Sequence, residues 1–370
     1  MTNAAATPAS VRNAATGAPN LTRPGDALAA PDANTAGTYE VSTASWGDAP
    51  TYGFARPADL LSVAASSRRE PVTFESEGVA LAGHLYLPPA ETNTAGRPAP
   101  AVALLGPMTF VKEQAPAEYA RRLASAGFVA LTFDPRGRGA SGEGGGVVRD
   151  QEDPLAKAID MRHAVTFLAN HPAVDPARIA AVAVCQGSSA MLRAAADDPR
   201  IRAVATLAGH YRDHAGDVAW LGGEDALATR RARGEAARAH FAASGEVLTV
   251  PAVDPERTDV GMPGEFVWRW YQPWADAGVW PNRYAVMSDA ALLAYESRSA
   301  AERLTTPYLM IHSDQSFLPA AARRHFDAVP GPTKRLLWAG ETLHFQFYDD
   351  PVVLDEATAH IVAWFRTHLG

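Results

Sequence analysis

The stretch Ile179-Ala-Ala-Val-Ala-Val-Cys185-Gln186-Gly187-Ser188-Ser189-Ala190 decides the fold of this chain. Its six apolar residues show no polar alternation, which predicts a strand covered on both faces, as in the centre of a parallel sheet. The residues from Ala190 onward predict a helix, so a short polar turn joins the two elements. In the Gly-x-Ser-x-Gly turn that presents a nucleophile between a strand and a helix, the serine stands third. Cys185 occupies this third place.

Two roles fit Cys185, the only cysteine of the sequence. A lone cysteine at the end of an apolar strand is commonly a small buried hydrophobic residue. At an elbow between strand and helix, its thiolate is a nucleophile that needs a nearby base. The turn alone leaves both roles open.

Buried strands alternate with helices on both sides of this elbow. The order predicts a mostly parallel sheet with helices on both faces, which is the α/β class, preceded by a strand hairpin over 72–87. The predicted strands are 101–105, 128–133, 179–184, 201–208, 308–312 and 335–339, and the predicted helices are 116–126, 154–170, 190–196, 318–329 and 352–369.

The chain divides into three parts. Residues 1–70 are an N-terminal arm, partly disordered, because its first forty residues contain few large apolar side chains. Residues 71–210 and 305–370 carry the strands and helices of the core. Residues 211–304 interrupt that alternation with helical, aromatic-rich segments, which predicts a lid.

The lid is much richer in aromatic residues than the chain as a whole, which contains 8%. These rings either form the core of the lid itself or line an apolar substrate pocket between the lid and the sheet. The pocket candidates are Trp268, Trp270, Tyr271 and Trp274.

Composition limits the partners of the protein. The formal charge of −8, without a basic block, argues against nucleic acid. A single cysteine excludes an internal disulfide framework, and neither a signal peptide nor a membrane-spanning apolar run is evident. We therefore expect a cytoplasmic protein with a small-molecule substrate, no membrane partner, no metal and no cofactor. A homodimer is left open.

His344 is the best candidate for a base, because it lies in a predicted loop between the last strand and the last helix. Asp314 follows the strand 308–312 and is the candidate acid. The resulting order of nucleophile, acid and base is that of enzymes with this strand–turn–helix layout. Asp314 could instead cap a turn, and a thiol could work with His344 alone because its pKa is close to neutral.

An oxyanion that forms during acyl transfer needs backbone N–H donors. Gln186 follows the nucleophile and supplies one of them. Met108, in the loop after strand 101–105, is expected to supply the second. Glu113 in the same loop either touches the thiol or caps the helix that begins at 116.

The chain from about 72 to 369 resembles the α/β-hydrolase superfamily, in particular its dienelactone-hydrolase-like branch. Four segments carry the resemblance, and Tyr271, Asn282 and Met287–Ser288 extend it into the lid. The resemblance implies Cys185 as nucleophile, His344 as base and an acid near Asp314. The four segments are Val111–Gln114, Phe133–Gly142, the Cys185 elbow and His344–Asp349.

The sequence also departs from the pattern of that branch. Gly106–Phe110 stands where that branch has a histidine followed by proline and glycines. Its bulkier side chains narrow the oxyanion loop, which is the loop that carries Met108. Gly187-Ser188-Ser189 replaces a turn richer in glycine, and Ser316 stands where the acid usually does. These departures suggest a specialised substrate.

Three functions follow. The first is a cysteine-dependent hydrolase of a small ester, lactone or thioester, acting through an acyl-enzyme on Cys185. The second is an acyltransferase or cyclase of secondary metabolism that uses the same acyl-enzyme with water excluded. The third is a ligand-binding protein that keeps the fold without catalysis.

Overall fold

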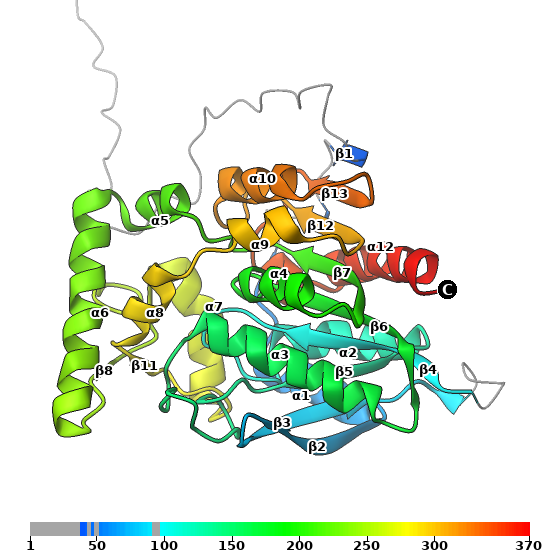
Figure 1. Cartoon of the computed structure of the whole chain (residues 1–370), viewed down its shortest axis with the longest axis horizontal. Coiled ribbons are helices and arrows are strands. Elements are labelled where there is room, and N and C mark those ends of the chain that lie inside the picture. Colours follow the sequence, from blue (N-terminus) through cyan, green and yellow to red (C-terminus); the bar gives the residue numbers. More distant parts are fainter. Residues whose placement is uncertain (1–37, 43–45, 48–51, 91–96) are drawn as a thin grey trace, which may run out of the picture.

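The computed structural model describes residues 38–42, 46–47, 52–90 and 97–370 (Figure 1). Residues 1–37, which include most of the predicted disordered region, lie outside these ranges. Figure 1 shows a layered body built on a sheet, with the helices of residues 214–244 and 288–294 at the left beside one end of that sheet.

The described residues form a nine-stranded sheet in the order β1-β13-β12-β7-β6-β4-β5-β3-β2. Neighbouring strands are parallel except where β3 pairs with β2 and with β5. The prediction of a mostly parallel sheet is therefore confirmed. The strands are β1 (Thr38–Ser42), β2 (Arg69–Ser76), β3 (Val79–Tyr86), β4 (Ala99–Leu105), β5 (Val129–Phe133), β6 (Val174–Val184), β7 (Ile201–Leu207), β12 (Tyr308–His312) and β13 (Lys334–Ala339).

The elbow strand β6 lies near the middle of the sheet, between β4 and β7. Ala180 and Val182 contribute to the apolar layer on one face, and Ala181 and Ala183 to the layer on the other. Because both faces are covered, the strand has the continuous apolar sequence that predicts it. It begins at Val174, so the predicted connector at 175–178 is part of the strand.

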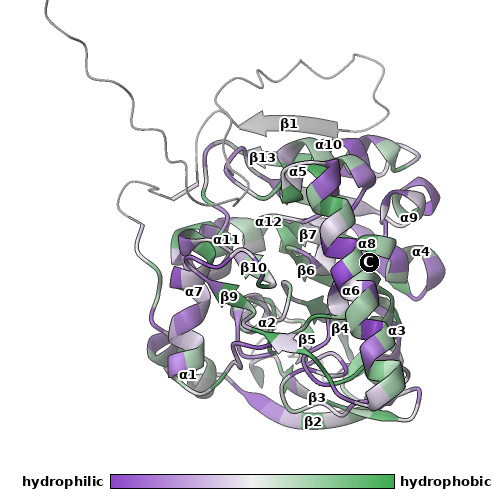
Figure 2. Cartoon of the chain, turned by 90° about the vertical axis from the view of Figure 1, so that its left-hand side faces the viewer, coloured by the Kyte–Doolittle hydropathy of each residue, from purple (hydrophilic) through white to green (hydrophobic). Residues whose placement is uncertain are grey.

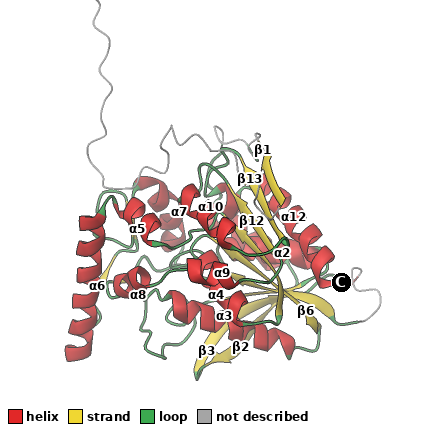
Figure 3. Ribbon diagram, turned by 45° about the horizontal axis from the view of Figure 1, so that its top comes forward, coloured by secondary structure: helices red, strands yellow, loops and turns green. Residues whose placement is uncertain are grey.

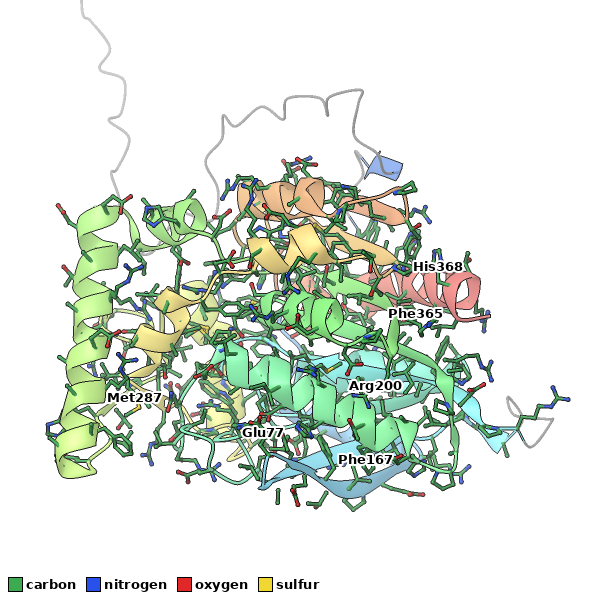
Figure 4. All side chains as sticks on the ribbon, viewed as in Figure 1. Glu77, Phe167, Arg200, Met287, Phe365 and His368 are labelled. Atoms are coloured by element: carbon green, nitrogen blue, oxygen red, sulfur yellow. The ribbon has the colours of Figure 1, made fainter. Side chains whose placement is uncertain are left out.

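Helices cover both faces of the sheet, as predicted (Figure 3). Phe365 and Phe167, labelled in Figure 4, lie in the helical layers of the two faces. The helices of one face are α2 (Ala115–Ser125) and α12 (Pro351–Leu369), and those of the other are α3 (Pro154–Ala169), α4 (Gly187–Asp197) and α10 (Pro319–Ala328).

The described parts of the N-terminal region pack on the core. Strand β1 extends the sheet beside β13, and helix α1 spans Pro57–Ser66. The ring of Trp46 stacks on His360 of α12 with centroids 5.5 Å apart. Phe54 contacts Phe345 at 5.8 Å. These residues of the predicted arm therefore belong to the folded body.

The lid contains five helices and four two-residue strands among the described residues. In Figure 2, α7 lies on one side of the sheet end and α6 with α8 on the other. No helix in the described ranges is long and apolar enough to cross a membrane. The lid elements are α5 (His214–Leu221), α6 (Glu224–Ser244), β8 (Thr249–Val250), β9 (Val253–Asp254), β10 (Met262–Pro263), α7 (Glu265–Asp276), β11 (Tyr284–Ala285), α8 (Ser288–Ala294) and α9 (Arg298–Arg303).

Candidate active site

Cys185 occupies a strained turn between β6 and α4. Its φ is +53°, a conformation that residues with a side chain rarely adopt. Its N–H donates to the Leu207 carbonyl at 3.0 Å, and its carbonyl accepts from Ser188 and His210, both at 2.9 Å. Three backbone hydrogen bonds therefore hold Cys185 in this conformation. A strained turn between a strand and a helix is the geometry of a nucleophile elbow.

The loop between β4 and α2 lies against this turn. At Gly187, an added Cβ would be 2.5 Å from the carbonyl oxygen of Gly106, so only glycine permits this approach. The backbone N–H groups of Gln186 and Met108 both face the Cys185 sulfur and lower the pKa of its thiol, which favours the thiolate form. The structure therefore brings both predicted oxyanion donors to the predicted nucleophile.

Lys157 connects the loop to the elbow from the first turn of α3. This helix starts at a proline, with the preceding Asp153 capping the N–H groups of Leu155 and Ala156. The buried Lys157 ammonium donates to the Pro107 carbonyl at 3.2 Å and to Gln186 Oε1 at 3.0 Å. It therefore ties the loop and the elbow together.

Glu152 balances the charge of Lys157. The two form a buried ion pair at 2.6 Å, and Glu152 also accepts from the Thr109 N–H at 2.7 Å. Burial lowers the pKa of Lys157, while the lysine charge lowers the pKa of the Cys185 thiol. Sequence reasoning missed both residues, although a lysine within the apolar pattern of the predicted helix 154–170 was a signal.

His344 lies close to the elbow, but its ring nitrogens have other partners than those predicted. Its Nε2 is hydrogen-bonded to the Tyr348 hydroxyl at 2.9 Å, and its Nδ1 accepts the Phe317 N–H at 3.3 Å. The hydroxyl of Tyr348 also lies beside the Cys185 sulfur and lowers the pKa of the thiol. Burial lowers the pKa of His344 to about 3. The Tyr348 hydroxyl thus lies between His344 and the thiol, where a direct hydrogen bond between these two groups was expected.

Tyr348 was not predicted as a site residue. It lies four residues after His344, on the short helix α11 (Gln346–Asp349), and this spacing places both side chains on one side of a helical turn. The spacing was visible in the sequence. Its meaning depended on knowing that the segment turns into a helix immediately after His344.

Asp314 is not the partner of His344 in this structure. Its Oδ1 accepts from the Trp338 indole N–H at 2.9 Å. Ser316, at the usual acid position, hydrogen-bonds Ser313 at 2.6 Å. The predicted triad contact is therefore corrected: the Nδ1 that an acid would hold faces a backbone N–H instead.

Glu113 takes neither of its two predicted roles. Its carboxylate pairs with Lys112 Nζ at 2.9 Å and lines a cavity of about 360 Å³ beside the loop. Helix α2 begins after Gln114 without a side-chain cap. The carboxylate that accepts from the N–H of Thr109, next to Met108, is that of Glu152.

The lid aromatics pack against the site. Trp270, Tyr271 and Trp274 are buried and Trp268 is half-buried. The Tyr271 hydroxyl donates to the Met108 carbonyl at 3.1 Å. Trp270 stacks on Phe345 with centroids 5.5 Å apart and planes within 4°. These rings therefore form the interface between the lid and the core, directly over the oxyanion loop.

The thiol is buried beneath this cover. Cys185 is 9% exposed. Burial raises the pKa of its thiol, against the opposing effects of Tyr348, the two N–H groups and Lys157. The resting site thus combines a neutral thiol with several groups that favour its charged form.

Comparisons with known proteins agree with this architecture. The model of the dienelactone hydrolase family matches residues 85–219. The uncharacterized protein YcjY of Escherichia coli is 28% identical over 79% of this chain and 95% of its own. Thiohydrolase apmlB of Arthrinium phaeospermum is 33% identical, over 37% of this chain and 42% of its own.

A solved structure shows the same fold. The α/β-hydrolase GrgF of a Penicillium species superposes with a TM-score of 0.67 at 22% identity, covering 81% of this chain and 99% of that chain. The polyketide transferase grgF is 30% identical to this protein over 38% of this chain and 45% of its own. The chain therefore has the α/β-hydrolase fold, and its residues 85–219 match the dienelactone hydrolase family.

Proposed function

We propose that the protein is a cysteine-dependent hydrolase of small thioesters or esters that works through an acyl-enzyme on Cys185. The observation that carries this proposal is the Cys185 sulfur at a strained elbow, facing the backbone N–H groups of Gln186 and Met108. The name of the thiohydrolase relative supports a thioester substrate.

The chemistry needs two steps. In the first, the sulfur bonds to the acyl carbon of RC(O)–X, and the leaving group departs as HX with the proton that the thiol gives up. In the second, water bonds to that carbon, the carboxylic acid leaves and the thiol is restored. The N–H groups of Gln186 and Met108 would stabilise the oxyanion of each tetrahedral intermediate.

We do not assign the role of general base to His344. Its Nδ1 accepts a hydrogen bond from Phe317, and its Nε2 is engaged by Tyr348. A neutral imidazole in this arrangement carries its proton on Nε2, so that nitrogen has no lone pair for the thiol proton. Asp314 likewise has no assigned role in proton transfer.

The test is turnover of a panel of acyl thioesters, esters and lactones by wild type and by Cys185→Ala. We expect the variant to fold and to lose about 10⁴-fold or more in kcat/KM. Mass spectrometry of wild type quenched during turnover should show the acyl group on Cys185. Turnover retained in Cys185→Ala, or a protein that binds the compounds without turnover, would refute the proposal.

Acyl transfer to an acceptor other than water is the second candidate. It is favoured by the buried thiol and by the lid residue Tyr271, whose hydroxyl donates to the Met108 carbonyl in the neighbouring loop. The relative named polyketide transferase supports it. Product analysis with and without an added amine or alcohol separates the two, because only transfer yields the amide or ester.

A further inference from the structure

The Tyr348 hydroxyl lies between the nucleophile and the histidine. It hydrogen-bonds His344 Nε2 at 2.9 Å and lies beside the Cys185 sulfur, where it lowers the pKa of the thiol. The tyrosine ring is held in place by Trp270 and Phe345, each with its centroid 4.9 Å away and nearly perpendicular. With 1% of its surface exposed, Tyr348 has a fixed position beside the thiol.

The direction of the hydrogen bonds follows from Phe317. Its backbone N–H donates to His344 Nδ1, so Nδ1 carries the lone pair and Nε2 carries the proton. The Nε2–H therefore donates to the Tyr348 oxygen. The hydroxyl proton of Tyr348 is then left for the sulfur, and the chain of donors ends at Cys185.

We propose that Tyr348 is a catalytic residue that donates a hydrogen bond to the Cys185 thiolate, and that His344 is a positioning residue that orients Tyr348 as a hydrogen-bond donor rather than a base. This inference rests on the proposed function, since it concerns the same thiol. In this role His344 needs no acidic partner. This agrees with the presence of Ser316 at the position where the acid usually stands.

The charges around the sulfur agree with such a role. The titratable groups that face it are Tyr348 on α11, Tyr271 on α7 and Lys157 on α3. Burial holds the pKa of both tyrosines well above its ordinary value, so their hydroxyls stay protonated. Charge-assisted hydrogen bonds are about twice as strong as neutral ones, so the thiolate gains more from Tyr348 than the thiol does.

The experiment measures the reactivity of the thiol without a substrate. Because Cys185 is the only cysteine, the rate of alkylation of the full chain by iodoacetamide, followed by intact mass across a pH series, reports this site alone. We expect Tyr348→Phe to raise the pH midpoint by about one unit and to slow alkylation roughly tenfold at neutral pH. Tyr119→Phe is the matched control, because this buried hydroxyl donates to the neighbouring Phe347 carbonyl at 2.7 Å. It should leave the midpoint unchanged.

A second pair of variants tests His344 with Tyr348 in place. The side-chain amide of His344→Gln keeps an N–H near the position of Nε2 but has no basic nitrogen, whereas His344→Ala keeps neither. A donor chain predicts that His344→Gln alkylates like wild type and that His344→Ala is slower. This pair decides the question even if Tyr348→Phe does not fold.

Two results would overturn the inference. An unchanged midpoint in Tyr348→Phe would mean that the tyrosine only packs, and equal reactivity of the two His344 variants would mean that no donor is needed there. Because alkylation needs no turnover, these results are independent of Cys185→Ala. The proposed function would be refuted by turnover in Cys185→Ala, and that result does not depend on the alkylation midpoints.

Discussion

At the scale of single residues, the site depends on the backbone around Cys185. A positive φ at a residue with a side chain costs about 1–3 kcal/mol, and the three backbone hydrogen bonds at Cys185 keep it in place. The adjoining Gly187 lets the elbow touch the carbonyl of Gly106. The sulfur and its N–H donors are therefore positioned by the main chain.

Gly187→Ala should separate the elbow from the oxyanion loop. The new Cβ would meet the Gly106 carbonyl at 2.5 Å, and such overpacking costs about 1–3 kcal/mol. We expect a lower urea midpoint and a loss of kcat at nearly unchanged secondary structure, measured by circular dichroism and turnover. Gly53→Ala, where an added Cβ has open space around it, is the control. Full activity in Gly187→Ala would show that the contact is dispensable.

At the scale of elements, helix α3 connects the two halves of the oxyanion site. Its Lys157 bonds the Pro107 carbonyl and the Gln186 side chain, while the Glu152 carboxylate, just before the helix, holds Thr109. A buried ion pair contributes little compared with apolar residues, but breaking it leaves an uncompensated charge. The pair therefore fixes geometry more than it stabilises the fold.

Lys157→Met should destabilise the protein by about 3–5 kcal/mol, because it leaves the Glu152 carboxylate buried and unpaired. Adding Glu152→Gln in the same chain should recover part of that loss, since the charge is gone. Urea unfolding of the two single variants and the double variant, arranged as a cycle, measures this coupling. Additive losses in the double variant would argue against a coupled pair.

At the scale of the whole molecule, Asp349 joins three regions of the chain. Its buried carboxylate accepts from the Tyr52 hydroxyl and the Ala55 N–H of the N-terminal region, and from the Trp270 indole N–H of the lid at 3.0 Å. Burial raises the pKa of Asp349 from 3.8 to about 7. Ionising this carboxyl is thus less favourable in the folded protein than in the unfolded chain.

The pH dependence has a definite sign. Between about pH 4 and 7 the folded chain holds a proton on Asp349 that the unfolded chain has lost, so this contribution to stability is present at low pH and declines as the pH rises. Asp349→Asn should remove that decline, so its stability relative to wild type, measured by urea unfolding, should improve as the pH rises from roughly 4 to 7. Asp276→Asn, at an exposed position of α7, is the control. A difference that does not vary with pH would contradict the assignment.

Much of the fold could be predicted because it depends on local patterns. The run 179–184 is apolar on both faces, so it predicts a central strand, and the alternation with helices predicts the parallel sheet and its two covered faces. The elbow places Cys185 and Gln186 through sequence adjacency alone. Met108 could be predicted because the strand before it ends beside the elbow strand.

The partners of the site were harder to predict, because they depend on side-chain directions set by packing. Asp314 follows the expected strand, yet it bonds Trp338, and Glu113 pairs with Lys112. Tyr348 reaches the thiol because α11 turns its hydroxyl back toward His344.

Local sequence patterns were enough to predict the sheet, the layers of helices and the position of Cys185 at an elbow. These follow from the period of apolar residues and from neighbours along the chain, which act over a few residues. Tertiary packing sets which group faces the sulfur, which groups bond the two nitrogens of His344 and which carboxylate bonds Thr109. Those outcomes depend on contacts between residues far apart in sequence, where shifts of about an ångström select one hydrogen-bond partner over another.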